Sequence, residues 1–561
     1  MPISIALWDC ATALLVVFPF LTGGVWIERP GMFIELSDIG IQTILLLVWA
    51  LLLYWFNRPI EKSRVLHYAA NLWRAWETSL DKYPKSTIWG GAVFFGLLWS
   101  LSSLTRHWDY GSHAYDLTIF TGSLWNLAHG FGFYSSIKGG ISEFADHLYF
   151  TLLLILPLYK LFPKAETLLI LQAFGLAAAG VPLYFLCKQY LKHPEQNWIA
   201  AAVPLMCWAY APNRNAYYFD FHPDCWLLGL ELAGIYFFQS LSTRRRILGA
   251  LFFLLAVLTK ETGALDCVGV GAAWVLGAAP ESSQKFTKKL GLILLVLGVA
   301  IFSLELKWVP KILHYEYAYQ SPFEDLGHGL GAVILSPFTK PVLFFSRILG
   351  SARLKYLFWT LAPLGFLPFL NLGTSLAAIP TYLILFLCQG EHRLSTGWHY
   401  SVQPSIGLFW SLPLAIYRLE KMKSPAFAKY FVLAFALIFF GRSELFRIRE
   451  LWPNEHANWL SSKLIPCLQT PASMSAEEAL TPHLSERFWI NEVPFLTEKS
   501  GKLVDCVVLD EMVHRYDQAP ADRAQVEQTL KDNYHEIYSC GSVRVFQQGN
   551  PTCMSCTPDC R

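Results

Sequence analysis

The chain has 561 residues, of which 54% are hydrophobic and 15% charged, and its mean hydropathy is +0.36. Soluble domains carry about 25% charged residues, so this chain has too few charges to cover a water-facing surface of its size. With 44 Lys and Arg against 42 Asp and Glu, it also lacks the basic field that nucleic-acid binding requires. Disordered chains and small disulfide-rich secreted proteins have other compositions. The composition predicts an α-helical polytopic membrane protein.

About 13 apolar runs approach the roughly 17–25 residues that a helix needs to cross a bilayer. They lie near 11–27, 40–56, 87–104, 166–187, 198–212, 225–240, 246–259, 263–279, 290–306, 356–371, 373–389, 402–417 and 429–441. The first run lacks a cationic leader and a second span follows at once, so a cleaved signal peptide is not expected. The short run 148–162 is broken by Pro157. We expect it to lie on the outer membrane face or to re-enter the membrane.

Basic residues collect in loops that fall on one side if these spans alternate. They are Arg58, Lys62, Arg64, Arg74, Lys82, Lys85, Lys188, Lys192, Arg244, Arg245, Arg246, Lys285, Lys288, Lys289, Arg418, Lys421, Lys423 and Lys429. Because Lys and Arg are enriched in cytoplasmic loops, this side is predicted to be the cytoplasm, together with the N-terminus. Two N-terminal spans and a basic loop (1–86) then precede a membrane core (87–441). The predicted outer loops of this core are 105–165, 213–224, 307–355 (with an amphipathic helix) and 390–401.

The segment 442–561 is charged, punctuated by proline and no longer membrane-like. LVDCVVLD at 503–510 predicts a buried strand, 521–534 predicts a helix, and the following residues predict a hairpin that turns at Gly541. A small α/β domain on the extracytoplasmic side is therefore expected.

The 12 cysteines divide into two groups of six. Cys10, Cys187, Cys207, Cys225, Cys267 and Cys388 lie in or near the membrane and need no functional explanation. Cys467, Cys506, Cys540, Cys553, Cys556 and Cys560 lie in the tail. An even number outside the membrane favours disulfides of unknown connectivity. Free thiols remain an alternative, as does a metal at the last three positions, although structural zinc usually needs four ligands.

Two acids in the first outer loop, Asp109 and Asp116, follow a span and stand among aromatic residues. A carboxylate near apolar groups has a raised pKa and can act as a general base. The alternative is that both are solvated loop acids or helix caps.

The second outer loop holds Asp220, His222 and Asp224 just before a span. Two acids with an imidazole could bind a cation or orient a hydroxyl or phosphate, whereas Asp224 alone could simply stabilise a helix N-terminus. Lys260 and Glu261 interrupt an apolar stretch at its outward turn. Charges near membrane depth tend to be paired or functional, although this pair could also be interfacial.

Further polar residues fall on the same predicted outer face. Each is weak evidence of a site when taken alone, and their shared face is what makes them candidates. They are Asp146, His147, Arg214, Arg353, His399 and Tyr400.

Several motifs in chain order resemble those of a known family. They are Tyr115-Asp116-Leu117 with Phe120, WNLAHG at 125–130, Asp146-His147, FDFHP at 219–223, Lys260-Glu261, HYS at 399–401, Pro482-His483-Leu484-x-x-Arg487 and VVLD at 507–510. On these motifs the chain resembles a family of prokaryotic multi-pass membrane proteins defined only as a domain of unknown function. The resemblance covers about 105–515 and is most specific in the first two outer loops.

That family in turn resembles the GT-C superfamily of integral-membrane glycosyltransferases, which use polyprenyl-phosphate sugars. The resemblance implies a GT-C-like fold with outer-face amphipathic helices, located in the prokaryotic inner membrane. By position it implies Asp116 as general base, Asp220 or Asp224 as the second-loop acid, and Lys260 near the lipid phosphate. Asp109 is retained as a further catalytic candidate. The candidates for substrate binding are His147, Arg214, His222, Lys260, Glu261, Arg353, His399 and Tyr400.

The predicted reaction moves a sugar, with inversion, from a polyprenyl-phosphate donor to an acceptor of the cell envelope. A divalent cation is left open as a cofactor. Thr121 stands where the family has a further acid, and the Asp-Glu doublet of many protein mannosyltransferases is absent. These departures leave two alternatives: a transporter or flippase for a lipid-linked or small polar substrate, and a non-catalytic membrane scaffold.

Overall fold

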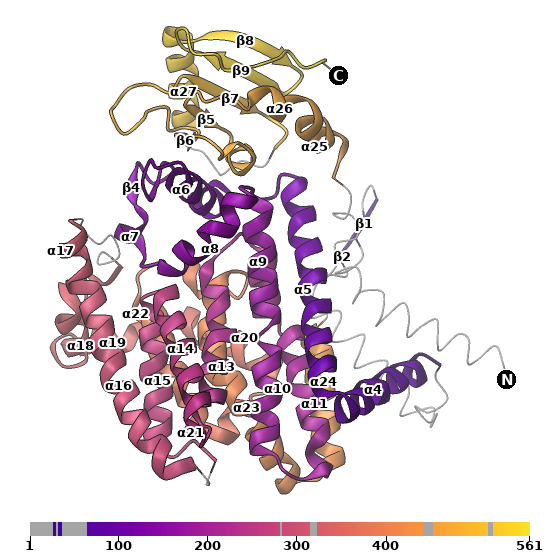
Figure 1. The fold of residues 1–561 in the computed structure, drawn as a ribbon. Helices are drawn as coiled ribbons and strands as arrows, with labels where there is room; N and C mark the ends of the chain where they lie inside the picture. The colour runs from indigo at the N-terminus through magenta and orange to yellow at the C-terminus, as the bar shows by residue number, and fades with distance from the viewer. Residues whose placement is uncertain are drawn as a thin grey trace.

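The computed structural model describes residues 26–29, 32–35, 64–280, 283–314, 322–440, 453–513 and 520–560. Figure 1 shows a long helical body with a small sheet-containing unit at one end. The predicted spans near 11–27 and 40–56, and Cys10, lie outside the described residues, except that Trp26–Arg29 (β1) pairs with Met32–Glu35 (β2) in an antiparallel hairpin.

The helices of the body follow one another closely. The first half contains α4 (Arg64–Lys82), α5 (Pro84–Trp108), α6 (Ile119–Ala128), α7 (Glu143–Asp146), α8 (Phe150–Leu161), α9 (Ala165–Ala177), α10 (Gly180–Tyr190), α11 (Asn197–Ala209), α12 (Ala211–Tyr218), α13 (Leu227–Phe238), α14 (Thr243–Thr259) and α15 (Thr262–Val275). The second half contains α16 (Gln284–Lys307), α17 (Val309–Leu313), α18 (Gly329–Thr339), α19 (Pro341–Ile348), α20 (Ser351–Leu361), α21 (Leu372–Ser375), α22 (Ile379–Leu387), α23 (Val402–Met422) and α24 (Pro425–Phe440).

Fewer of these helices are full spans than the sequence predicted. In the described part of the chain, four segments are long and apolar enough to cross a membrane: Pro84–Trp108, Ala165–Tyr190, Gln284–Leu313 and Leu367–Leu387. A fifth would be Gly329–Thr339 with Pro341–Leu364, which are bent by 94° at their break. Other predicted runs form shorter helices because polar turns cut into their ends. α14, for example, stops at Thr259, just before Lys260.

The apolar run 148–162 forms α8, which has 12 residues and contains Pro157. At 1.5 Å per residue this helix is about 18 Å long, too short to cross the hydrocarbon core. It is accordingly not among the segments that qualify as spans. The chain therefore departs from the membrane-spanning pattern at this point, as expected.

The connections α10–α11, α15–α16 and α23–α24 lie at the end of the body opposite the sheet unit (Figure 1). Basic residues here make local contacts: Lys188 donates to Asn197 across the α10–α11 connection, and Arg418 near the end of α23 donates to the backbone carbonyl of Leu370 at 2.6 Å. The Arg246 guanidinium lies 4.0 Å from the centroid of the Phe286 ring. Much of the basic charge predicted to be cytoplasmic thus gathers at one end of the molecule.

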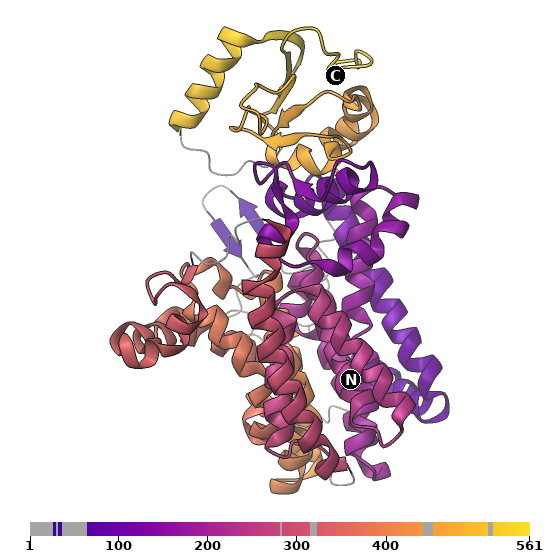
Figure 2. The ribbon, with the colours of Figure 1, turned by 60° about the vertical axis from the view of Figure 1, so that its left-hand side comes forward.

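Helices α18 and α19 project sideways from the body, as Figure 2 shows. Their apolar side chains face outward, and Phe338 and Val342 are each 84% exposed. This arm (329–348) occupies much of the third predicted outer loop, where the sequence predicted an amphipathic helix. Residues 315–321 of that loop lie outside the described residues.

The C-terminal unit is built on a mixed five-stranded sheet in the order β6-β5-β7-β9-β8. Its strands are β5 (Met474–Ala476), β6 (Ile490–Glu492), β7 (Cys506–Asp510), β8 (His535–Cys540) and β9 (Val543–Gln547), and its helices are α25 (Glu455–Trp459), α26 (Ile465–Leu468) and α27 (Pro520–Asn533). β5 is parallel to β6 and β7, whereas β9 is antiparallel to β7 and β8. The strand, helix and hairpin predicted here are all present.

Three disulfides close this unit: Cys467–Cys556, Cys506–Cys553 and Cys540–Cys560. Cys553, Cys556 and Cys560 each pair with a different partner, so the alternative of a shared metal site is wrong. The unpaired cysteines in the described residues are all buried in the body: Cys187, Cys207, Cys225, Cys267 and Cys388. Disulfides persist in oxidising compartments, which agrees with an extracytoplasmic tail.

The tail motif Pro482-His483-x-x-x-Arg487 fastens the C-terminal unit to the body. The His483 ring stacks on those of His107 and Tyr110, with centroids 4.1 Å apart in both cases. Arg487 is 1% exposed and donates to three backbone carbonyls of its own unit. His483 and Arg487 therefore have structural roles, which explain why a histidine and an arginine stand at these two positions.

We expect the double change Cys506→Ser with Cys553→Ser to destabilise the C-terminal unit by about 2–5 kcal/mol, because the disulfide joins a central strand to the chain end. Thermal unfolding of the purified protein measures this effect. Cys388→Ser is the control, since Cys388 is unpaired. Peptide mapping that found a different pairing among the six cysteines would contradict the connectivity.

Candidate functional site

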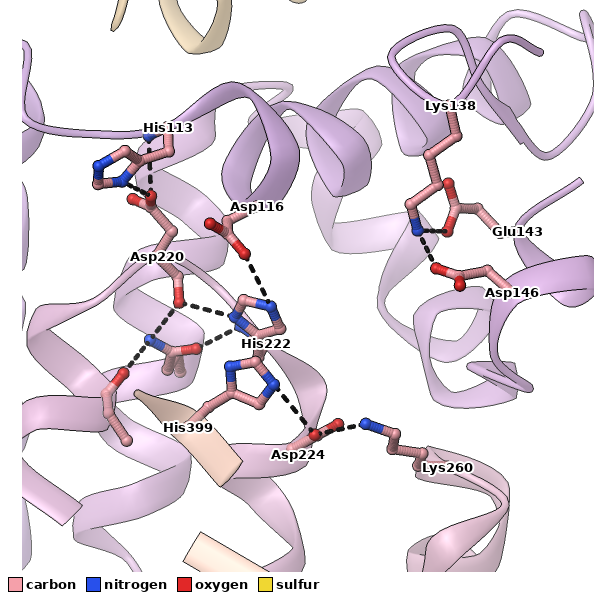
Figure 3. Close-up of polar contacts among 12 residues, drawn as sticks. His113, Asp116, Lys138, Glu143, Asp146, Asp220, His222, Asp224, Lys260 and His399 are labelled. Carbon is pink, nitrogen blue, oxygen red and sulfur yellow. Dashed lines mark hydrogen bonds and ion pairs between the residues drawn. The ribbon is translucent and has the colours of Figure 1, made fainter. Parts of the chain in front are cut away.

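A buried ion pair joins the first and second outer loops. Asp220, which follows α12 and is 0% exposed, accepts from Arg106 Nη1 through Oδ1 at 2.9 Å. Its Oδ2 accepts from the backbone N–H of His113 at 2.8 Å and lies 2.9 Å from the same residue's Nδ1 (Figure 3). The end of α5 and the loop after it are thereby fixed against the second loop.

The electrostatics of this pair follow from its burial. Desolvation alone would raise the pKa of Asp220, but the charges and hydrogen bonds of Arg106 and His113 outweigh it and hold that pKa well below its usual range. Burial would lower the pKa of His113, yet its hydrogen bond to Asp220 leaves that pKa raised. Asp220 is therefore an anion, with His113 favoured as its cationic partner.

The second loop also positions His222 against Asp116. Gln172 on α9 accepts from the backbone N–H of His222 at 2.5 Å and donates to the carbonyl of Asp220 at 3.2 Å. His222 Nε2 then lies 3.3 Å from Asp116 Oδ1. Asp116 belongs to a short π-helix, η3 (Ala114–Thr118), and its side chain keeps 23% exposure whereas that of His222 has 8%.

From His222 the polar contacts continue to the lysine. The rings of His222 and His399 stack with centroids 3.5 Å apart. His399 Nε2 lies 3.6 Å from Asp224 Oδ2, which accepts from Lys260 Nζ at 2.7 Å. Figure 3 shows this chain from Asp116 to Lys260. It joins four segments that are far apart in sequence: the first, second and fourth outer loops and the turn after α14.

Three further candidates border this chain. His147 Nδ1 lies 2.6 Å from Glu261 Oε1, and the backbone N–H of Leu148 donates to the other carboxylate oxygen at 3.2 Å. These contacts attach the start of α8 to the turn between α14 and α15. The Tyr400 ring lies 4.1 Å from that of His399.

Three predicted residues have other environments. Asp109 Oδ1 accepts from the backbone and side-chain nitrogens of Asn454 at 2.8 and 2.9 Å, so it anchors the C-terminal segment. Arg353 pairs with Glu391 at 3.3 Å at the edge of the fourth outer loop. Arg214 is 1% exposed within α12.

Sequence reasoning missed Arg106 and His113, the partners of Asp220, and also a lysine and two acids near the site. Lys138 pairs with Asp146 and lies 4.0 Å from Glu143, so it holds the first outer loop together (Figure 3). Glu478 and Glu492 come from the C-terminal unit. Only the docking of that unit brings them near the first loop, and no local sequence signal could have indicated it.

The two acids of the C-terminal unit have raised pKa values. Burial is the main cause for Glu478; His113 lowers its pKa by less, and the net pKa is about 7. For Glu492, burial and then the charge of Glu478 raise the pKa to about 8. Both carboxyls therefore titrate near neutral pH.

His113, Asp116 and Asp220 have ligand atoms within 4.8 Å of one another and could hold a metal ion. One imidazole and two carboxylates suit a divalent cation. Both oxygens of Asp220 already serve Arg106 and His113, however. The charge of Asp220 is therefore balanced by this chain's own residues, and a metal ion would have to displace them to bind here.

The family model "Predicted membrane protein (DUF2079)" matches residues 106–544. The chain therefore belongs to this family, and the recognition made from the sequence motifs is confirmed. None of the curated proteins matches it significantly.

Solved structures to which the chain is similar include those of two proteins, each at low identity. ArnT from Cupriavidus metallidurans bound to undecaprenyl phosphate is 12% identical, with a TM-score of 0.43 over 81% of this chain and 97% of that one. Its apo state is also 12% identical, with a TM-score of 0.46 over 85% of this chain and 98% of that one. The oligosaccharyltransferase of Archaeoglobus fulgidus, tethered to an acceptor peptide, is 14% identical, with a TM-score of 0.39 over 84% of this chain and 75% of that one.

We expect Arg106→Gln to destabilise the protein by about 3–5 kcal/mol, because it leaves the buried Asp220 carboxylate without its main cation. The double change Arg106→Gln with Asp220→Asn should cost less than Arg106→Gln alone, since the uncompensated charge is gone. Thermal melts of the two single variants and the double variant form the test. Strict additivity of the single effects would show that the two side chains do not interact.

Glu478→Gln and Glu492→Gln should stabilise the protein at alkaline pH. The pKa of each carboxyl rises on folding, from the ordinary 4.5 to about 7 for Glu478 and about 8 for Glu492. The folded state thus binds more protons, and stability falls as pH rises from about 4.5 through these values. Melting temperatures at pH 5 and 8.5 test this. Variant and wild type should differ much more at pH 8.5 than at pH 5, and equal melting at pH 8.5 would contradict the burial argument.

Proposed function

We propose that this member of the DUF2079 family is an integral-membrane glycosyltransferase of GT-C type. It would transfer a sugar from a polyprenyl-phosphate donor to an extracytoplasmic acceptor, with inversion at the anomeric carbon. The observation that carries the proposal is the chain of contacts that begins at the partly exposed Asp116 and ends at the buried Lys260. This chain of contacts supplies a base, Asp116, and a cation, Lys260, at the end of the helical body that carries the C-terminal unit.

Asp116 is the proposed general base. Its carboxylate is oriented by His222, and enough of it is exposed for an acceptor to reach. It takes the proton of the acceptor hydroxyl while the oxygen forms a bond to the anomeric carbon. The bond from that carbon to the phosphate oxygen breaks on the opposite face, and its electron pair leaves with the polyprenyl phosphate.

Lys260 is the proposed partner of the leaving phosphate. A cation close to the developing negative charge lowers the barrier to bond cleavage. Asp224 now neutralises this lysine, with His399 as its other neighbour. A phosphate would share Lys260 with Asp224, and the single N–H of a neutral His399 ring would add a second donor.

The surroundings support a membrane enzyme that works on the outer face. The arm of α18 and α19 exposes Phe338 and Val342, which suits contact with lipid tails. The C-terminal unit has three disulfides, and the basic loops gather at the opposite end of the body. We therefore infer a protein of the prokaryotic plasma membrane with a cytoplasmic N-terminus and an extracytoplasmic C-terminal unit.

Asp116→Asn should lower transfer or donor hydrolysis by about 10²–10⁴-fold, the usual contribution of a general base. Binding of polyprenyl phosphate should change little. The measurement uses purified protein, radiolabelled polyprenyl-phosphate sugars and a panel of donors.

Asp109→Asn is the matched control. Asp109 lies in the same loop as Asp116, but its carboxylate accepts from Asn454, whereas that of Asp116 contacts His222. It should retain turnover. Equal losses in both variants, or equal turnover of Asp116→Asn and wild type, would rule out Asp116 as the base. If no donor bound wild type, the glycosyltransferase proposal would fall.

A further inference from the structure

The C-terminal unit presents an acid to the same loop that carries Asp116. A short 3-10 helix, η15 (Glu478–Leu484), packs against η3 through a 2.9 Å contact between the hydroxyls of Thr481 and Thr118. Residues three apart in a 3-10 helix share one face. Glu478 therefore lies on the face of η15 that meets η3.

Glu492 reaches the same place from the neighbouring strand. It is the last residue of β6 and pairs with Ala476 at the end of β5. The backbone N–H of Val493 donates to the carbonyl of Ala476 at 2.9 Å, so the end of β6 lies beside the start of η15. The two acids thus come together although 14 positions separate them in the sequence.

Each acid holds a carboxyl oxygen that lacks a partner. Glu478 is 4% and Glu492 is 9% exposed. The Oε2 atom of each is buried without a hydrogen-bond partner among the described residues. An unmet buried polar atom is costly and rare in folded proteins. Two such atoms on one face indicate a ligand that donates hydrogen bonds.

The charges around these acids favour a cationic donor. The acids that act on Glu478 are Asp116 and Asp220, and the cations are His113 and Arg106. Both cations already pair with Asp220. Glu492 is also influenced by His113, and Tyr115 is a further titratable neighbour. Negative charge therefore exceeds the positive charge left to balance it.

We propose that Glu478 and Glu492 form the acceptor subsite of the Asp116 centre and bind the ammonium group of an amine-bearing acceptor. The ammonium donates hydrogen bonds to the two free carboxyl oxygens while the acceptor hydroxyl reaches Asp116. As an acceptor subsite the proposal rests on the glycosyltransferase function above. The binding itself forms or breaks no covalent bond.

The subsite should bind amines more tightly as pH rises. The pKa values of about 7 for Glu478 and about 8 for Glu492 mean that both ionise between pH 6 and 8.5. An aliphatic ammonium, with a pKa near that of lysine at about 10, stays protonated over this range. Affinity should therefore increase about tenfold between pH 6 and 8.5, the two acids releasing protons on binding.

The test titrates full-length purified protein with ethanolamine and, as its uncharged counterpart, N-acetylethanolamine. Wild type should bind ethanolamine with the stated pH dependence and N-acetylethanolamine at least about tenfold more weakly, the loss of a charge-assisted hydrogen bond. Glu478→Gln and Glu492→Gln should each weaken ethanolamine binding about tenfold at pH 8.5. The matched control is Glu536→Gln, an exposed acid of β8.

Equal binding of the two probes by wild type would overturn the proposal without reference to any variant, as would ethanolamine affinity that is unchanged in both Gln variants. Binding of Mn²⁺ that depends on Glu478, without ethanolamine binding, would replace the amine by a metal and also overturn it. Polyprenyl-phosphate binding is measured in the same samples. If it fails while ethanolamine binds as expected, the transferase function falls and the amine site stands; the reverse result removes only the amine site.

Discussion

The site depends on one buried carboxylate, Asp220. In a low-dielectric setting an unpaired carboxylate is too costly to keep, so its position fixes where Arg106 and His113 must lie. His222 comes two residues after Asp220, and Asp116 comes three residues after His113. The ion pair therefore places Asp116 and His222 against each other, because one of its members stands a few residues before each of them. A change at Asp220 would be felt at Asp116 without touching it directly.

A second consequence is the contrast between the two ends of the polar chain. Asp116 keeps an exposed fraction of 23%, whereas Lys260 and Asp224 are almost fully enclosed. A base must meet an acceptor from water, and a cation that steadies a departing phosphate works best where water is excluded. The His222 and His399 rings lie between these environments. In the proposed reaction, the arrangement separates the two chemical tasks while keeping them in one connected network.

How much the sequence revealed depended on the distance between the partners. FDFHP at 219–223 and the Lys260-Glu261 doublet could be recognised because charged residues stand out in apolar surroundings. Lys260 pairs with Asp224, and Glu261 with His147. Asp109 looked equivalent to Asp116 in local pattern, but its partner, Asn454, lies 345 positions away. Glu478 and Glu492 were invisible for the same reason. In the tail, β7 and the β8–β9 hairpin were readable from the sequence, whereas β5, β6, the disulfide pairing and the short, polar-ended helices required tertiary structure.

Two acids inside the body bear on the transporter alternative. Asp266 Oδ2 accepts from Gln403 at 2.9 Å, and Thr262 donates to the same Gln403 at 3.1 Å. Asp266 is four residues into α15 from Thr262, about 6 Å at 1.5 Å per residue, and Glu231 is equally close to the outer start of α13. Beyond them neither helix carries another charged residue. Transport needs polar groups on the way across, whereas in these two helices the charges end near the helix starts that lie towards the proposed site, which favours the proposed surface chemistry over passage through the membrane.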